Sequence, residues 1–153
     1  MHEASELALS EGFGEAVWWG VRAIGGYAAL GLLLLVVGFY ILDFVTPGHL
    51  AKIIRLERNP NAGIIAAAGT FGIGLIVAAS ILGSGGSLIE GLIATAAFGA
   101  TGIVAQTVAV LVFDKVIGVD VRGVIAEPKL APAAVLLGAA HVAIGFITAA
   151  AVF

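Results

Sequence analysis

Four long runs of apolar, almost uncharged residues make up most of this chain. The runs cover about residues 19–42, 62–82, 88–113 and 132–153. At about 1.5 Å per residue, each run is long enough as a helix to cross the roughly 30 Å hydrocarbon core of a bilayer. Charged residues make up only 11% of the chain, against roughly 25% in soluble domains. The sequence therefore predicts an all-α integral membrane protein with four transmembrane helices.

The second half of the sequence repeats the plan of the first. A shift of 71 residues carries Asp43 onto Asp114, and each aspartate ends an odd-numbered span. The same shift aligns Tyr27 with Phe98, Gly20 with Gly91, Gly31 with Gly102 and Gly74 with Gly145. Chance matches are expected in a chain rich in glycine and alanine, so the aspartates and the aromatic pair carry most weight. Because each half holds two spans, we predict two parallel, directly duplicated helical hairpins, over residues 18–82 and 88–153.

The first 17 residues form a separate acidic segment. It contains four glutamates and no lysine or arginine, whereas a secretory signal peptide begins with basic residues. Gly12 and Gly14 interrupt a helix here, so we expect a mostly solvated N-terminal tail over residues 1–17. Trp18 and Trp19 follow, and adjacent indoles before an apolar run are typical of the aromatic belt at a membrane interface. Ordinary aromatic packing is the alternative interpretation.

The basic residues predict how the chain is oriented. Six of the seven lie in the first and third loops, namely Lys52, Arg55, Arg58, Lys115, Arg122 and Lys129. The glycine-rich turn over residues 83–87 has none, and Arg22 stands alone near the start of the first span. The positive-inside rule therefore places both basic loops in the cytoplasm and both termini outside.

Three helix faces are predicted to pack against protein, because small residues recur on them and allow close approach of backbones in lipid. In the second span the face is Ala66, Thr70, Gly74 and Ala78. In the fourth it is Leu137, His141, Gly145 and Ala149, and in the third it is Thr95, Gly99, Gly102 and Gln106. The Leu, Ile and Val faces are expected to meet lipid.

Two motifs carry a family resemblance. They are T-P-G at residues 46–48 and N-P-N-A-G-I-I-A-A-A-G-T-F-G at residues 59–72. On a four-span duplicated plan, the chain resembles the YjfL-like bacterial inner-membrane proteins, which carry domain of unknown function 350 (DUF350/UPF0719). In that family the second half often keeps an asparagine before its last span, whereas residues 130–133 here read L-A-P-A. The resemblance implies a multi-pass protein of the bacterial inner membrane and supplies no biochemical activity.

His141 is the foremost polar candidate, because an imidazole near the middle of a span needs a partner. One interpretation is a neutral His141 hydrogen-bonded across the bundle to Thr70, Gln106 or a backbone carbonyl. The other is a proton relay, for which the spans provide no carboxylate near their middle. The first interpretation is favoured for that reason.

Asp43 and Asp114 each sit at the C-terminal end of a span, where a carboxylate opposes the helix dipole. We therefore expect a cationic neighbour for each, forming a symmetric layer of ion pairs at the cytoplasmic end; a cation-binding mouth is the functional alternative. Asn61 is expected to cap the first free amides of the second span.

The first loop is predicted to contain a short amphipathic helix. Thr46 can cap it, Pro47 suits its first position, and Leu50, Ile53 and Ile54 form an apolar side that would lie on the membrane. Its basic surface consists of Lys52, Arg55 and Arg58. These cations would meet either anionic lipid headgroups or a cytosolic partner.

The motifs that are absent from the sequence constrain its possible functions more than the motifs that are present. The sequence has no cysteine, no pattern of metal ligands, no cofactor motif and no nucleophile beside a base, so we expect neither an enzyme nor a metal or cofactor site. A net charge of −3 argues against nucleic acid as a partner. We expect a structural or accessory subunit that associates in the bilayer with itself or with other membrane proteins. The alternative is a small channel or an ion-coupled transporter that uses His141 and the mouth at Asp43 and Asp114.

Overall fold

The computed structural model describes residues 12–46 and 48–153, and in these ranges the regular structure is entirely helical. The elements are α1 (Phe13–Val45), α2 (Leu50–Lys52), the π-helical turn η1 (Ile53–Glu57), α3 (Pro60–Gly83), α4 (Leu88–Val112), the π-helical turn η2 (Phe113–Ile117), α5 (Val121–Ala126) and α6 (Pro132–Ala150). Helices α1, α3, α4 and α6 are long and apolar enough to cross a membrane. The predicted all-α architecture with four transmembrane helices is confirmed.

The first span begins earlier than the sequence predicted. Helix α1 starts at Phe13, after Gly12 in a left-handed conformation with φ of 89°, so residues 13–17 of the expected tail are helical. Glu15 in the first turn favours this start, because a carboxylate there complements the helix dipole. Residues 1–11 of the predicted tail lie outside the described part of the chain.

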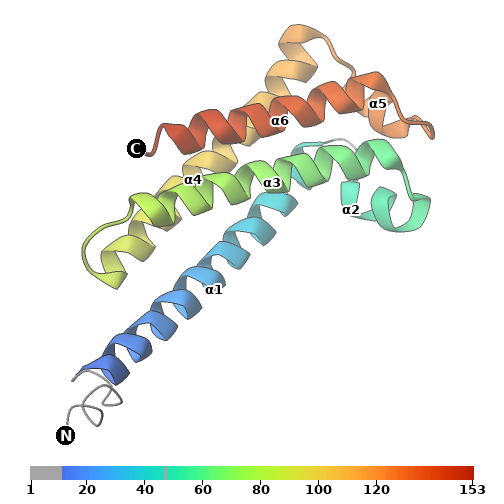
Figure 1. The fold of residues 1–153 in the computed structure, drawn as a ribbon. Helices are drawn as coiled ribbons and strands as arrows, with labels where there is room; N and C mark the ends of the chain where they lie inside the picture. Colours follow the sequence, from blue (N-terminus) through green and yellow to red (C-terminus); the bar gives the residue numbers. More distant parts are fainter. Residues whose placement is uncertain (1–11, 47) are drawn as a thin grey trace, which may run out of the picture.

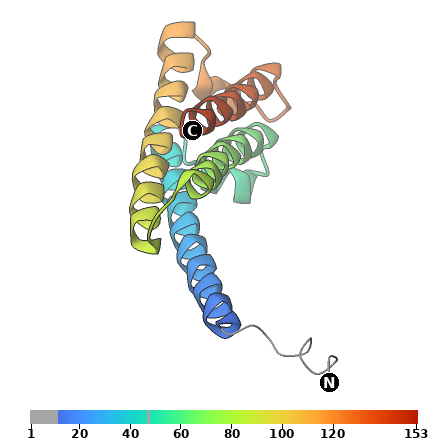
Figure 2. The same cartoon turned by 60° about the vertical axis from the view of Figure 1, so that its left-hand side comes forward.

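The four long helices form two crossing layers. Helices α3 and α6 lie side by side (Figure 1), and they make the most extensive contact in the molecule. Helices α1 and α4 run along the other side of this pair (Figure 2). Helices α3 and α4 each contact all three of the other long helices, and α3 makes the more extensive contacts, so α3 is the centre of the fold.

Glycines bring α3 and α6 into backbone contact. A Cβ atom added at Gly145 of α6 would lie 2.5 Å from the Cα atom of Gly72 in α3, so neither position can hold a larger residue without separating the helices. Close approach of this kind provides the packing that holds helices together in lipid, where no hydrophobic effect drives them together.

The start of α1 and the end of α6 lie at one end of the bundle, which we name the terminal end (Figure 1). There the Tyr27 hydroxyl of α1 is 3.0 Å from the Ser84 hydroxyl in the turn between α3 and α4, and Val152 lies close to Gly83. The opposite end, which we name the loop end, contains α2, η1, η2 and α5. This arrangement fits a chain that crosses the bilayer four times.

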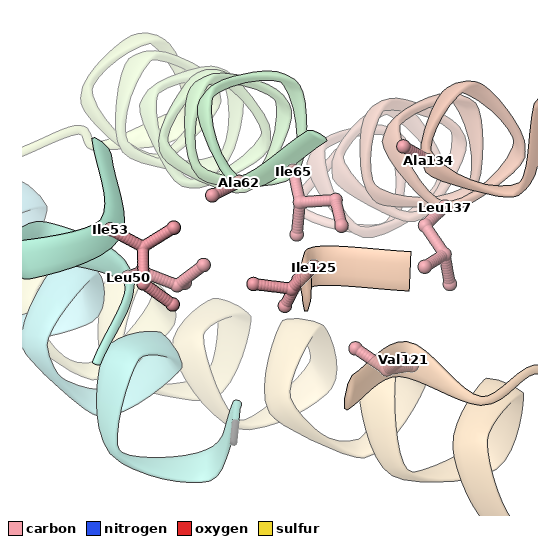
Figure 3. Packing of buried hydrophobic residues seen from close by; sticks show 8 residues of the cluster. All are labelled: Leu50, Ile53, Ala62, Ile65, Val121, Ile125, Ala134 and Leu137. Carbon is pink, nitrogen blue, oxygen red and sulfur yellow. The ribbon is translucent and has the colours of Figure 1, made fainter. Parts of the chain in front are cut away.

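The short helices of the two loops pack against each other, contrary to the prediction for the first loop. Leu50 and Ile53 are 1% and 9% exposed, so they do not lie on the membrane surface. They join one core cluster at the loop end, drawn in Figure 3: Leu50, Ile53, Ala62, Ile65, Val121, Ile125, Ala134 and Leu137. The apolar side of the first loop thus faces α5 and the starts of α3 and α6, and of the three predicted residues only Ile54 is partly exposed.

The predicted cap of this loop is also wrong. Thr46 is the C-terminal cap residue of α1, and His49, in a left-handed conformation, precedes α2 without a side-chain hydrogen bond. Thr46 is buried, at 2% exposed. Pro47 lies outside the described residues.

Two of the three predicted helix faces are correct. Thr95, Gly99, Gly102 and Gln106 of α4 are all buried, and so are Leu137, His141 and Gly145 of α6, with Ala149 partly exposed. The prediction for α3 is wrong beyond Ala66, because Ala78 is exposed and Thr70 and Gly74 are partly exposed. Small residues lie on every side of α3 itself, and the buried glycines among them are Gly69 and Gly72.

Candidate functional site

A buried polar pair joins α4 to α6 in the middle of the bundle. The Gln106 side-chain nitrogen donates to the backbone oxygen of His141 at 2.9 Å, and the Gln106 Oε1 atom lies 2.6 Å from His141 Nδ1. The two residues are 0% and 3% exposed. Because an amide oxygen only accepts hydrogen bonds, Nδ1 is the protonated nitrogen of the imidazole and donates to it.

This pairing answers one question that the sequence left open. Of the partners predicted for His141, Gln106 is the one that contacts it. Thr70 does not, because its hydroxyl donates to the Ala66 carbonyl one turn earlier in its own helix, at 2.8 Å. The charge of His141 stays a prediction.

Two glycines of α3 make room for the pair. A Cβ atom at Gly72 would collide with the Gln106 side-chain nitrogen and would lie 2.9 Å from the His141 carbonyl oxygen. A Cβ atom at Gly69 would lie 3.6 Å from His141 Nδ1. The polar pair therefore sits where α3, α4 and α6 meet, and the sequence pattern chosen for α3 did not include either glycine.

Two asparagines at the start of α3 hold the segment that leads into α6. Asn59 donates to the carbonyls of Ile125 and Glu127 at 2.7 and 2.9 Å. Asn61 donates to the carbonyls of Glu127 and Lys129 at 2.9 and 2.8 Å, and its oxygen accepts from the Ala131 amide at 2.8 Å. We name this arrangement the asparagine clamp. It joins the first half of the chain to the second at the loop end.

The clamp corrects the role predicted for Asn61. The side chain that caps α3 is Asn59, whose oxygen accepts from the amides of Asn61 and Ala62. Asn61 is fully buried at the second helical position and points to the other loop instead. Pro60, as the first helical residue, is the signal that identifies the residue before it as the cap.

Asp43 and Asp114 have similar backbone partners and different charged ones. Asp43 accepts from the Ala51 amide at 3.2 Å, and Asp114 accepts from the Val121 amide at 3.3 Å. Asp114 also pairs with Lys115 at 2.7 Å. Within the described ranges Asp43 has no salt-bridge partner, so the predicted symmetric layer of ion pairs is wrong for Asp43. The Ala51 amide, which is free at the start of α2, binds its carboxylate instead.

The predicted site residues thus fall into two separate groups. Gln106 and His141 meet in the middle of the bundle, whereas Asp43, Asp114 and Asn61 lie at the loop end. No hydrogen bond connects the two groups in the part of the chain that the structure describes. Nor does any group of three acidic or histidine side chains there lie close enough to hold a metal ion.

Comparison with known proteins adds the family. A family profile described as Domain of Unknown Function (DUF350) matches residues 11–152, which is nearly the whole chain. The chain belongs to this family. The resemblance inferred from residues 46–48 and 59–72 is thereby confirmed.

Relatives of this DUF350 protein carry names that agree with its architecture. A UPF0719 transmembrane protein of Mycolicibacterium paratuberculosis is 33% identical over 126 residues, which cover 82% of this chain and 83% of the relative. UPF0719 transmembrane proteins of Mycobacterium bovis and Mycobacterium tuberculosis are each 32% identical over 132 residues, covering 86% of this chain and 87% of each relative. No solved structure matches the chain significantly.

A large hollow of the DUF350 protein lies between α1 and α3, toward the loop end. We name it the loop-end groove; its volume is about 770 Å³, and its lining includes Phe39, Ile54, Gly63, Ala67, Thr70 and Phe71. The small residues predicted to face protein in α3 lie along it. A second groove of about 580 Å³ continues toward the terminal end, lined by Ile24, Tyr27, Ala28 and Leu32 of α1 among others. The two grooves share Leu35, Gly74 and Ala78 in their linings.

Proposed function

We propose that this DUF350 protein is an association subunit of the bacterial inner membrane, which binds other membrane proteins or further copies of itself and is not an enzyme. The observation that carries the proposal is the exposure of most residues of α1. Of its 33 residues, four are buried, and these form one line: Gly31, Leu34, Gly38 and Leu42. Every position from Gly12 to Arg22 is exposed.

The length of α1 supports the same conclusion. At about 1.5 Å per residue, α1 is about 50 Å long, whereas α6 with its 19 residues is about 28 Å long. The beginning of α1 therefore projects beyond the other helices, as Figure 2 shows. Trp18 and Trp19, which are 62% and 54% exposed, lie on this projecting part, and large aromatic side chains are favoured at protein interfaces. We infer that the first half of α1 is the helix that a partner covers.

The alternative, a small channel or ion-coupled transporter, has less support. Gln106 and His141 are bonded to each other, and Asp43 and Asp114 bind backbone amides. A conducting path needs polar groups that face a hydrated route through the bundle. The buried polar groups described above serve instead to connect helices and loops.

The orientation belongs to the same proposal. Lys52, Arg55, Arg58, Lys115, Arg122 and Lys129 all lie on the loop-end side of the four spans. The positive-inside rule then assigns the loop end to the cytoplasm and both termini to the outside.

Two single-cysteine variants test the association proposal, because the natural chain has no cysteine. Ile24→Cys places a thiol on α1 at a side chain that is 71% exposed, and Ile147→Cys places one on α6 at a side chain that is 69% exposed. In native membranes we expect a lipid-soluble maleimide to label Ile147→Cys quickly and Ile24→Cys slowly, and harsh detergent to abolish the difference. The mass in mild detergent should exceed that of one chain. Equal labelling of the two variants together with a monomeric mass would refute the proposal.

A further inference from the structure

The loop-end groove combines an apolar interior with a cationic rim. Phe39 of α1 and Phe71 of α3 stand on its two walls. Thr70 is a polar residue in the lining, and its hydroxyl is already bonded to the Ala66 carbonyl. A volume of about 770 Å³ lies within the range of about 300–1,000 Å³ that small-molecule sites occupy. The interior is therefore suited to a hydrocarbon chain and offers nothing to a polar one.

The rim of the groove at the loop end is formed by η1. Ile54 belongs to the lining, and Arg55 follows it directly. Lys52, the last residue of α2, and Arg58 flank η1, and all three cations are exposed. In the described ranges none of the three forms a salt bridge, although Glu57 lies between Arg55 and Arg58 and Asp43 binds the Ala51 amide nearby. The rim therefore carries more positive than negative charge.

We propose that the loop-end groove is a binding site for one anionic phospholipid, with an acyl chain between Phe39 and Phe71 and the phosphate at Lys52 and Arg55. Charge complementarity selects this occupant. A neutral transmembrane helix would use the apolar walls and leave the cations unpaired, whereas a free phosphate would use the cations and leave the walls exposed. An anionic lipid satisfies both, since basic residues at the membrane surface attract acidic headgroups. The site uses the loop-end half of α1, so it does not depend on what covers the first half.

The test uses the full chain purified in detergent, with lipid binding followed by native mass spectrometry. The probes are phosphatidylglycerol and phosphatidylcholine with identical acyl chains. We expect phosphatidylglycerol to bind about thirtyfold more tightly, because each of two basic residues contributes about fivefold. The double variant Lys52→Gln/Arg55→Gln should bind the two lipids equally. Inorganic phosphate at the same concentration should not displace the lipid.

The apolar part of the site needs its own variants. Ala67→Phe fills the groove from the exposed side of α3, and Ala143→Phe is the matched change on the exposed side of α6. Gly63→Leu is a second filling variant, because a Cβ atom at Gly63 meets nothing within 4 Å and the fold can accept it. Ala67→Phe and Gly63→Leu should lower the binding of both lipids at least tenfold, while Ala143→Phe leaves it unchanged.

Three outcomes would overturn the proposal. One is equal binding of the two lipids by the natural chain, and another is unchanged lipid binding after the groove has been filled. The third is a lipid-free dimer that Ala67→Phe dissociates, which would assign the groove to a second copy. Labelling of Ile24→Cys as fast as that of Ile147→Cys would count against the association proposal alone. The failure of one proposal is therefore distinguishable from the failure of the other.

Discussion

Gln106 holds His141 at two points, donating to its backbone carbonyl at 2.9 Å and accepting from its imidazole at 2.6 Å. One amide thus fixes both the position of α6 and the orientation of the ring. In a buried site each of these hydrogen bonds matters chiefly because its loss leaves the other partner unsatisfied. This relationship leads to the first prediction.

Replacement of Gln106 by leucine should destabilise the bundle by about 1–3 kcal/mol, because a buried Nδ1–H group loses its acceptor and the His141 carbonyl loses its second donor. The second change, His141→Leu, made in the Gln106→Leu background, should recover part of this loss, since it removes the orphaned imidazole. Unfolding in mixed detergents measures the free energies of the two single variants and the double variant. Strictly additive losses would show that the pair is not coupled.

Replacement of Gly72 by alanine should be more damaging than a methyl group usually is. The new Cβ atom collides with the Gln106 side chain and approaches the His141 carbonyl, so α3 and α6 must separate, at a cost of about 1–3 kcal/mol. Gly74→Ala is the control on the same helix, because its Cβ atom meets only Leu35 at 3.9 Å. The control should be neutral or stabilising by up to about 1 kcal/mol, since alanine favours a helix over glycine. Equal effects of the two changes would contradict the packing described for α3.

Asn59→Asp separates the two functions of that residue. An aspartate still accepts from the amides of Asn61 and Ala62, so the cap of α3 remains, but it cannot donate to the carbonyls of Ile125 and Glu127. We expect α3 to stay helical to its first residue while hydrogen exchange rises in residues 125–131.

Asn61→Ala should raise exchange in the same segment further, and most at the Ala131 amide, which loses its acceptor. Hydrogen–deuterium exchange followed by peptide mass spectrometry measures both variants. Unchanged exchange in residues 125–131 would show that the clamp is not needed to hold the loop.

Arg58 has a left-handed backbone, with φ of 52°, which a residue with a side chain adopts at a cost of about 1 kcal/mol. Arg58→Gly should therefore be more stable than Arg58→Ala by roughly that amount, since both lose the charge and only the glycine relieves the strain. Thermal unfolding of the two variants provides the comparison. If the alanine variant is equally stable, the backbone at this position is not strained.

The spans could be predicted from the sequence because each is a long apolar run. The inner faces of α4 and α6 could be predicted because Thr95, Gln106 and His141 cannot favourably face lipid. The inner face of α3 was not predictable in this way. Its small residues lie on every side, and a periodic pattern of glycine and alanine does not distinguish a packed face from an open groove. The duplication of the two hairpins stays a prediction.

The loops show a different limit of sequence reasoning. An amphipathic pattern at Leu50 and Ile53 indicates that one side is buried, but it does not say whether a bilayer or another loop covers that side. The partner, Val121 with Ile125, is far away in the sequence. For Asn61 the error was avoidable, because Pro60 already marked Asn59 as the cap.

The asparagine clamp has a consequence for how this protein is made. Translation produces α3 well before residues 125–131, whose carbonyls and amide the two side chains bind. While the chain is still emerging from the ribosome, Asn59 can already cap α3, but the side-chain nitrogens of Asn59 and Asn61 and the side-chain oxygen of Asn61 still lack the partners that the second half provides. The clamp can therefore close only after residues 125–131 have been synthesised, so the start of α3 becomes fixed after the rest of its own hairpin.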